Sequence, residues 1–271
     1  MTEIVHSGPS TNGGLRPRPR LPQIRPETVY QRNRPTPDRL NNSMRRTYDL
    51  LRSSLQSGIG SPYLVESELT DALSASRNTV RAVLQQLARD GLVTRSPKRG
   101  TRASGSLLLR LNNLAPVAEF GGGEPIHTAL QALEHQTLGC PPMVRERLEL
   151  PPDWTVLMTE ALLVKGDEAL GISVSYVALS PDQSGDIAVS EPDPILFLEN
   201  YLEVRIVSSR TTIGATAADQ QTADLVGVSV GAPMIFLEDI LEDENGQPRA
   251  LSQFRMRSDR IAFSASATRS A

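Results

Sequence analysis

The first regular pattern in the chain is a helical stripe that starts soon after Leu40. Met44, Tyr48, Leu51 and Leu55 share one face at the 3.6-residue helical period. Gly58 follows at the point where a helix would end. We therefore expect an amphipathic helix here, with its apolar stripe turned toward a core.

Two further helices are predicted at 66–73 and 77–90, separated by the three-residue turn 74–76. Ser76 is placed to cap the second of them, and Gly91 is placed to end it. Within that helix the apolar residues repeat at i, i+3, i+4 and i+7: Val80, Val83, Leu84 and Leu87. This face is predicted to be buried. The opposite face carries side chains that can reach phosphates or base edges: Arg77, Asn78, Arg81 and Gln85.

A short basic hairpin is predicted directly after the third helix. Residues 92–95 form one strand, 96–100 a tight turn and 101–103 the returning strand, and four cations surround the turn: Arg95, Lys98, Arg99 and Arg102. Two helices joined by a tight turn and followed by a basic hairpin are typical of a winged helix-turn-helix. In that fold the second helix enters the major groove and the hairpin, or wing, grips the flanking backbone.

The second half of the chain shows strand periodicity in two hairpins. The first pairs 155–164 with 170–179 around Lys165-Gly-Asp, and the second pairs 234–241 with 250–256 around Glu244-Asn-Gly. The hairpins align without a gap, which predicts a duplicated β unit, although chance similarity of two amphipathic hairpins stays open. Helices are expected between them, at 195–202 and 219–226. The fold class is therefore α+β, with an antiparallel sheet and helices after the helix-turn-helix.

Composition divides the chain into four segments. Residues 1–38 hold seven prolines and six arginines with almost no apolar clustering, so we expect a disordered Arg/Pro-rich tail. Residues 39–104 would be the DNA-binding domain, 105–124 a glycine-containing linker, and 125–271 an effector-binding and dimerisation domain. Gly121-Gly-Gly123 lacks the Lys and Ser/Thr of a phosphate loop and is interpreted as a hinge.

Charge separates the two halves. Residues 1–110 carry 18 Lys and Arg against 8 Asp and Glu, and the remainder carries 10 against 23. A basic half that neutralises phosphates beside an acidic half that avoids them predicts a double-stranded DNA partner for the first half alone. The Arg-rich tail inflates this count and is itself interpreted as a solvated segment.

The remaining composition narrows the class of protein. No long apolar run and no secretion signal are present, so no membrane partner and a cytoplasmic location are expected. The single cysteine, Cys140, excludes an intramolecular disulfide. The three histidines have no ligand spacing of the kind that zinc sites use, so neither a metal nor another cofactor is predicted. No nucleophile or acid/base constellation indicates an enzyme.

The run from Ala75 to Val93, ASRNTVRAVLQQLARDGLV, resembles the recognition-helix signature VSRTTVREALRRLEAEGLV of the GntR family of bacterial regulators. The sequence ESEL at 66–69 resembles the SExEL of the family's second helix. The resemblance implies that Arg77, Thr79 and Arg81 contact operator DNA, that Ser76 caps the helix and touches phosphate, and that the wing tip is Lys98-Arg99-Gly100-Thr101. Tyr63-Leu-Val65 replaces the family's Leu-Pro-Ser, which removes a phosphate-contacting serine.

The C-terminal region resembles the UTRA ligand-sensing domain of the HutC subfamily. The motifs are LVGVSVGAPMIFLE at 225–238, NGQP at 245–248 and FRMRSDR at 254–260. The resemblance implies the chorismate lyase fold, an antiparallel sheet with helices and pseudo-twofold symmetry. It also implies a small-molecule effector as a partner.

The sensor departs from its family where the family binds anions. Many members carry an Arg-x-Arg pair ahead of the first turn, where this chain has Ala161 and Leu163. Where the family often has LER, this chain has Leu237-Glu-Asp239. Because arginine suits phosphate and carboxylate, its loss argues against a phosphosugar and for a neutral, cationic or mostly apolar effector. Polar residues on or near the strands are the candidates for effector binding: Glu160, Ser173, Ser175, Tyr176, Glu238 and Arg255.

The function expected from these features is that of a sequence-specific, homodimeric transcription regulator. It would act as a repressor whose operator binding is modulated by an effector, and Ser76, Arg77, Asn78, Thr79, Arg81, Gln85, Arg95, Lys98, Arg99, Gly100 and Thr101 would contact DNA. Two alternatives stay open at this point. One is a ligand-independent DNA-binding dimer with a degenerate sensor, and the other is a lyase-like enzyme fused to a DNA-binding head.

Overall fold

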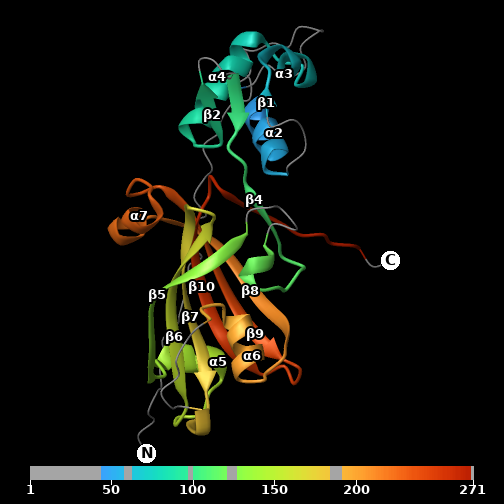
Figure 1. Ribbon diagram of the computed structural model, residues 1–271. Helices are drawn as coiled ribbons and strands as arrows, with labels where there is room; N and C mark the ends of the chain where they lie inside the picture. Colours follow the sequence, from blue (N-terminus) through green and yellow to red (C-terminus); the bar gives the residue numbers. More distant parts are fainter. Residues whose placement is uncertain (1–43, 58–62, 97–99, 121–126, 184–190, 270–271) are drawn as a thin grey trace, which may run out of the picture.

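The computed structural model describes residues 44–57, 63–96, 100–120, 127–183 and 191–269. Two regions are distinguished below: the head, residues 44–103, and the sheet domain, residues 104–269. Figure 1 shows the head at the top, with the strand β4 leading down from it into the long strands of the sheet domain. The predicted tail, 1–38, lies outside the described residues.

The head consists of three helices and a small antiparallel sheet in the order β1-β3-β2. Its elements are α2 (Met44–Gln56), β1 (Tyr63–Leu64), α3 (Glu66–Ala72), α4 (Arg77–Arg89), β2 (Val93–Ser96) and β3 (Gly100–Ala103). The predicted helix-turn-helix and wing strands are confirmed. The strand β1, which pairs with β3, was not predicted because two residues carry no periodicity.

Local chemistry fixes the position of α4. The hydroxyl oxygen of Ser76 accepts a hydrogen bond from the Thr79 backbone N–H at 3.1 Å, so Ser76 is the predicted N-cap. At the other end, the Tyr48 hydroxyl of α2 donates to Asp90 Oδ2 at 2.6 Å. Burial, helped by the hydrogen bond to Asp90, raises the pKa of Tyr48. The predicted apolar face of α4 is fully buried against α2, which holds the opposite face outward.

The sheet domain is built on six antiparallel strands in the order β5-β6-β7-β10-β9-β8. Its elements are β4 (Leu107–Arg110), η2 (Val117–Glu119), β5 (Thr128–Gly139), α5 (Pro142–Leu148), β6 (Thr155–Lys165), β7 (Glu168–Leu179), η3 (Pro181–Gln183), α6 (Pro194–Tyr201), β8 (Ile206–Ala217), α7 (Gln220–Val226), β9 (Pro233–Asp243), β10 (Pro248–Arg257) and β11 (Ile261–Ser264). Both predicted hairpins and both predicted helices are present.

The strand order agrees with the predicted duplication and shows a longer repeat unit than the predicted hairpin. Each half is a strand, a helix and a hairpin, β5-α5-β6-β7 and β8-α7-β9-β10, and the halves meet where β7 pairs with β10. The repeat unit is therefore longer than the hairpin. The outer strands β5 and β8 escaped prediction because most of their residues are exposed at the sheet edges, and their apolar positions do not alternate cleanly.

The segment predicted as a plain linker, 105–124, is partly a structural element. Leu107 and Leu109 of β4 are buried, and β4 pairs in parallel with β11. Val117 of η2 is buried in the same cluster. The prediction of a plain linker is therefore wrong for β4 and η2, because three consecutive leucines at 107–109 show no strand alternation in the sequence. The predicted hinge, 121–123, lies outside the described residues.

The two faces of the large sheet are covered differently. One face packs against α5 and α7 through two apolar clusters. The other face, called the inner face below, packs against α6 at one end and against β4 and β11 at the other. Between those two inner clusters lies the cavity described next.

Candidate DNA-binding surface and effector cavity

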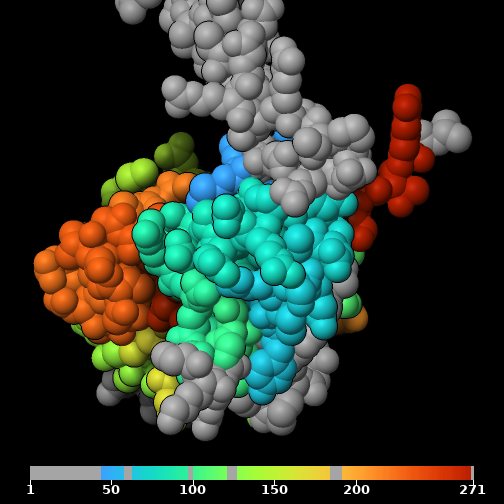
Figure 2. All heavy atoms as spheres, turned by 90° about the horizontal axis from the view of Figure 1, so that it is seen from above, coloured from blue at the N-terminus to red at the C-terminus, as the bar shows by residue number. Residues whose placement is uncertain are grey.

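The outward face of α4 carries the predicted DNA-reading side chains. Arg77, Asn78, Arg81 and Gln85 are exposed, and Thr79 is partly buried. Arg95 and Gly100 of the wing strands are exposed as well. Figure 2, viewed from above, shows the head occupying the end of the molecule, with α7 (orange) beside it. The arrangement presents cations and amides on one short helix with nothing from the described residues covering them.

Glu66, at the start of α3, organises two of these arginines. Its carboxylate accepts from Arg81 Nη2 at 3.2 Å and lies 3.4 Å from Arg95 Nη2. One carboxylate thus joins the second helix, the recognition helix and the wing strand. Sequence reasoning cited Glu66 only as part of a motif. Its role in orienting the arginines required the folded arrangement, because residues 66, 81 and 95 show no common periodicity.

The wing differs from expectation at one residue. Thr101 is buried, with 7% of its surface exposed, so its side chain faces the head core and not the solvent. Strand alternation explains this, because Thr101 pairs with Leu64, which packs against the head core, while the neighbouring Arg102 points to the other side, over the Tyr63 ring. The predicted tip residues Lys98 and Arg99 lie outside the described residues.

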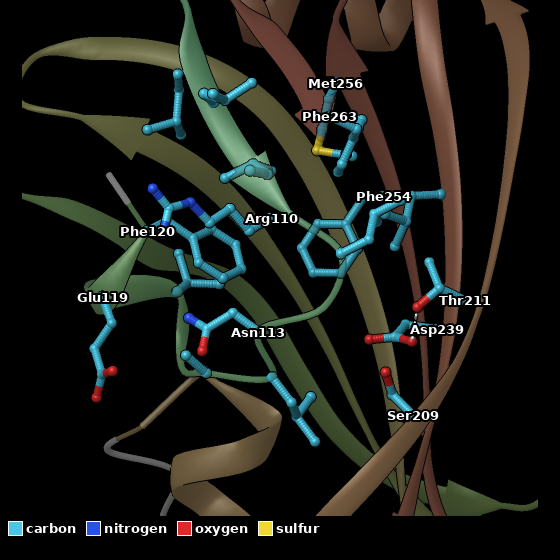
Figure 3. A pocket seen from close by; sticks show the side chains of 18 of the residues that line it. Arg110, Asn113, Glu119, Phe120, Ser209, Thr211, Asp239, Phe254, Met256 and Phe263 are labelled. Carbon is cyan, nitrogen blue, oxygen red and sulfur yellow. Dashed lines mark hydrogen bonds between the residues drawn. The ribbon is translucent and has the colours of Figure 1, made fainter. Parts of the chain in front are cut away.

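A cavity of about 450 Å³ opens on the inner face of the sheet domain. Figure 3 shows Asp239, Thr211 and Ser209 on one wall and Arg110 and Glu119 on the far side, with the rings of Phe254 and Phe120 between them. Most of the remaining lining is apolar, from β4 and the segment after it, from α6, and from β9 to β11. The volume lies within the range of ordinary small-ligand sites.

A row of polar residues crosses the inner face. The strand register places one residue from each strand directly opposite the next: His135, Thr159, Ser175, Ser252, Asp239 and Thr211. Opposed residues on neighbouring strands point to the same side of a sheet. The row therefore separates the two apolar clusters of the inner face, and its last three members line the cavity.

Two of the carboxylates that line the cavity, Asp193 and Asp239, have different roles. Asp193 accepts from the backbone N–H groups of Val117, Ile195 and Leu196, so it is a structural cap of α6. Asp239 accepts a side-chain hydrogen bond from Thr211 Oγ1 at 2.8 Å. Burial raises the pKa of both carboxyl groups, against the lowering effect of these hydrogen bonds.

The structure divides the six predicted effector residues between the two faces. Ser173 and Ser175 lie on the inner face, beside the cavity lining. The other four, by strand alternation, lie on the opposite face: Glu160, Tyr176, Glu238 and Arg255. There Glu238 pairs with Arg147 and Gln253, Arg255 pairs with Asp219, and Tyr176 packs against the α5 cluster. Glu238, Arg255 and Tyr176 thus have structural partners, and none of the four lines the cavity.

The cavity adjoins the connection to the head. Its lining includes residues 106–111 of β4 and its flanks, and also Gln56 and Ser57 at the end of α2. Arg260, just before β11, donates from Nη1 to the Gly91 carbonyl at 2.7 Å. Arg260 is in turn held by Asp259 and Glu168. A ligand in this cavity would thus touch the strand that leads to the head.

Neither a membrane-spanning helix nor a metal-binding cluster is present in the described ranges. None of their helices is long and apolar enough to cross a bilayer. No cluster of three or more His, Cys, Asp or Glu side chains there is arranged to hold a metal ion.

Two family models match the chain, one for each region. The model for bacterial regulatory proteins of the gntR family matches residues 44–102, and the model for the UTRA domain matches residues 126–262. The second match alone covers half of the chain.

Curated relatives cover most of the chain. A protein of Shigella flexneri named probable fructoselysine utilization operon transcriptional repressor is 25% identical over 218 residues, which is 79% of this chain and 88% of the relative. The HTH-type transcriptional regulator Rv0792c of Mycobacterium tuberculosis is 29% identical over 206 residues, 73% of this chain and 75% of the relative.

Solved structures share the fold. PhnF of Mycobacterium smegmatis superposes with a TM-score of 0.57 at 20% identity, covering 82% of this chain and 99% of that one. The possible transcriptional regulator YydK of Bacillus subtilis gives a TM-score of 0.52 at 16% identity, with 82% and 99% coverage. The named relatives are transcription regulators, which removes the enzyme alternative. The chain is a DNA-binding transcriptional regulator that belongs to the GntR family, in the HutC subfamily that carries a UTRA effector-binding domain.

Proposed function

We propose that the protein is a cytoplasmic, homodimeric repressor whose affinity for its operator changes when a small molecule enters the cavity. Two α4 helices would read half-sites about one helical turn, roughly 10 base pairs, apart. Contacts to DNA would come from Ser76, Arg77, Asn78, Thr79, Arg81 and Gln85 of the helix and its cap, and from Arg95 and Gly100 of the wing.

The observation that carries this proposal is the position of the cavity. One wall is β4, which continues directly into the head, and Gln56 and Ser57 of the head itself reach the cavity. On the other side of β4, β11 begins beside Arg260, whose guanidinium holds the Gly91 carbonyl at the end of α4. Occupancy of the cavity would therefore favour one placement of the heads over another, which is how a ligand shifts a conformational equilibrium.

The polarity of the response is proposed from a relative. The Shigella flexneri protein is named a repressor, and repression by this chain is proposed on that ground. Relief of repression by the ligand is part of the same proposal and rests on the position of the cavity. The presence of a lined cavity favours a working sensor over the degenerate sensor considered above.

The test is an anisotropy titration of labelled DNA from upstream of the protein's own gene, repeated with a panel of metabolites. Wild type is expected to bind this DNA and to lose affinity with at least one compound. The variant Thr211→Trp, which fills the cavity from an exposed position, should bind the same DNA without responding. Wild type that binds the operator and responds to no compound would establish the degenerate sensor instead.

A further inference from the structure

The inner face holds a charge that the fold does not need for its own stability. Asp239 lies between Leu237 and Leu241 on β9, both of which pack into apolar clusters. Its recorded side-chain partners are neutral hydroxyls, those of Thr211 and Ser209. Among the described residues no Lys, Arg or His forms an ion pair with it. A carboxylate in such surroundings costs free energy unless a cation or donor arrives from elsewhere.

A second unmet group lies next to it. Ser252 pairs with Asp239 across β10 and β9, lines the same cavity, and is only 2% exposed. Its Oγ atom is buried and has no hydrogen-bond partner. Buried polar groups without partners are rare in native proteins and call for an explanation. An unpartnered hydroxyl beside an unpaired carboxylate indicates that the missing partner is a ligand carrying hydrogen-bond donors.

The cations that line the cavity stand away from this point. Figure 3 places Arg110 on the Phe120 side, across the cavity from Asp239. Lys165 lies six residues along β6 from the polar row, a strand length of roughly 20 Å. Asp193, a buried carboxylate of the lining, is already satisfied by three backbone N–H groups. The charge that a ligand meets beside Ser252 is therefore negative.

The positions that would make an anion site are apolar or acidic. Ala161 and Leu163 are almost fully buried on the inner face, and Asp239 shares that face. Aromatic and aliphatic side chains form the larger part of the wall around Asp239 and Ser252, with Phe254 next to Ser252 along the inner side of β10. An apolar body fits this lining, and a cationic group also gains from neighbouring aromatic rings.

We propose that the effector is an amphipathic organic cation, whose protonated nitrogen pairs with Asp239 and donates to Ser252 while its apolar body lies against Phe254 and Phe120. This inference rests on the proposed function, because it names the ligand class of the same cavity. A cation restores favourable surroundings for the ionised Asp239. The pairing is a charge-assisted hydrogen bond in a partly enclosed site, which is stronger than one between neutral groups.

The experiment uses the full chain and three matched probe series: ω-phenylalkylamines with two to five methylenes, and the alcohols and carboxylates of the same lengths. Isothermal calorimetry is expected to show binding by at least one amine, with its alcohol and carboxylate counterparts at least tenfold weaker. Equal or tighter binding of the carboxylates, or no binding by any amine at millimolar concentration, would overturn the proposal.

Variants locate the binding. Asp239→Asn keeps the shape and both hydroxyl contacts and should weaken the amine roughly tenfold to a hundredfold, as expected for loss of a hydrogen bond to a charged group. Glu238→Gln, one residue away on the opposite face, is the matched control and should leave amine affinity unchanged. Ser252→Ala should weaken it by a smaller factor. Amine affinity that is the same in Asp239→Asn as in wild type contradicts the assignment.

Operator binding is measured separately, so the two proposals can fail independently. If amines bind through Asp239 but leave operator affinity unchanged, the ligand class holds and the proposed control of DNA binding fails. If no amine binds but another compound releases the operator, the ligand class fails and the proposed function holds.

Discussion

The head and the sheet domain use charge in opposite ways. The head places arginines on an exposed helix face and on the wing strand, where solvent hydrates them until phosphates replace the water, and Glu66 holds one arginine of each in position. The sheet domain places one carboxylate inside a cavity with an apolar majority lining. An exposed face suits a large polyanion that must be bound and released, and an enclosed wall suits a small ligand that must be discriminated.

The largest effect is expected on the head surface. Arg77→Ala and Arg81→Ala should each weaken operator binding about 5-fold to 150-fold, the range for loss of one specific base or phosphate contact of about 1 to 3 kcal/mol. Arg205→Ala, which removes an exposed sheet-domain arginine paired with Glu244, is the control and should leave DNA affinity unchanged. Anisotropy at fixed salt measures all three. Unaltered binding by both head variants would show that α4 does not read the operator.

The contact between the regions is tested at Gly91, which has φ +75° and would bring an added Cβ to 2.8 Å from Asp259 Oδ2. Gly91→Ala should lower the free energy of unfolding by about 1 to 3 kcal/mol, from backbone strain and from this clash. Gly105→Ala has the same strain, with φ +77° and open space around it. Both variants are compared with wild type by thermal unfolding. The loss in Gly91→Ala minus the loss in Gly105→Ala then measures the effect of the contact with Asp259. Equal losses would mean that the head and Asp259 do not touch in solution.

Acid should act with opposite sign on two carboxylates of the sheet domain, Asp259 at the contact with the head and Asp239 in the cavity. Burial raises the pKa of Asp259, but Arg257 and Arg260 outweigh burial, and the net shift is downward from the ordinary 3.8. Its stabilisation is therefore present above that value and is lost as the pH falls through the lowered pKa. Asp239, whose pKa is raised by burial, stabilises the fold at low pH and loses that contribution as the pH rises.

The measurement is thermal unfolding between about pH 7 and about pH 3 for wild type, Asp259→Asn and Asp239→Asn. The melting temperature of wild type minus that of Asp259→Asn should fall as the pH is lowered. The melting temperature of wild type minus that of Asp239→Asn should rise over the same range. If the two differences change in the same direction with pH, Asp259 at the contact with the head and Asp239 in the cavity do not have opposite pKa shifts.

The smallest effect is expected at Ser252. Without ligand, Ser252→Ala should raise the free energy of unfolding by about 1 kcal/mol, because an unpaired buried hydroxyl carries a desolvation cost. Ser173→Ala, on the same face, removes a hydroxyl that donates to the Ala161 carbonyl at 3.5 Å and should be neutral or slightly destabilising. Denaturant unfolding resolves the sign. Destabilisation by Ser252→Ala would show that its hydroxyl has a partner in the free protein.

The sequence alone determined the elements whose signal is local. The helix-turn-helix followed from a 3.6-residue stripe, an N-cap at Ser76 and a stop at Gly91, all within about twenty residues. The two hairpins followed from alternation and turn residues. The loss of the family's arginines at Ala161 and Leu163 was also visible, because it required only alignment on a turn.

The tertiary structure decided which residues meet. The cavity residues Asp239, Ser252 and Thr211 come from three strands, and only the register places them in one row. The same register places four predicted effector residues on the opposite face: Glu160, Tyr176, Glu238 and Arg255. Successive residues along a strand point to opposite faces, so a difference of one position reverses the face. The joining of β4 to β11 and of Arg260 to Gly91 spans about 150 residues or more. Pairings at such separations depend on the whole sheet being formed, so no local pattern in the chain records them.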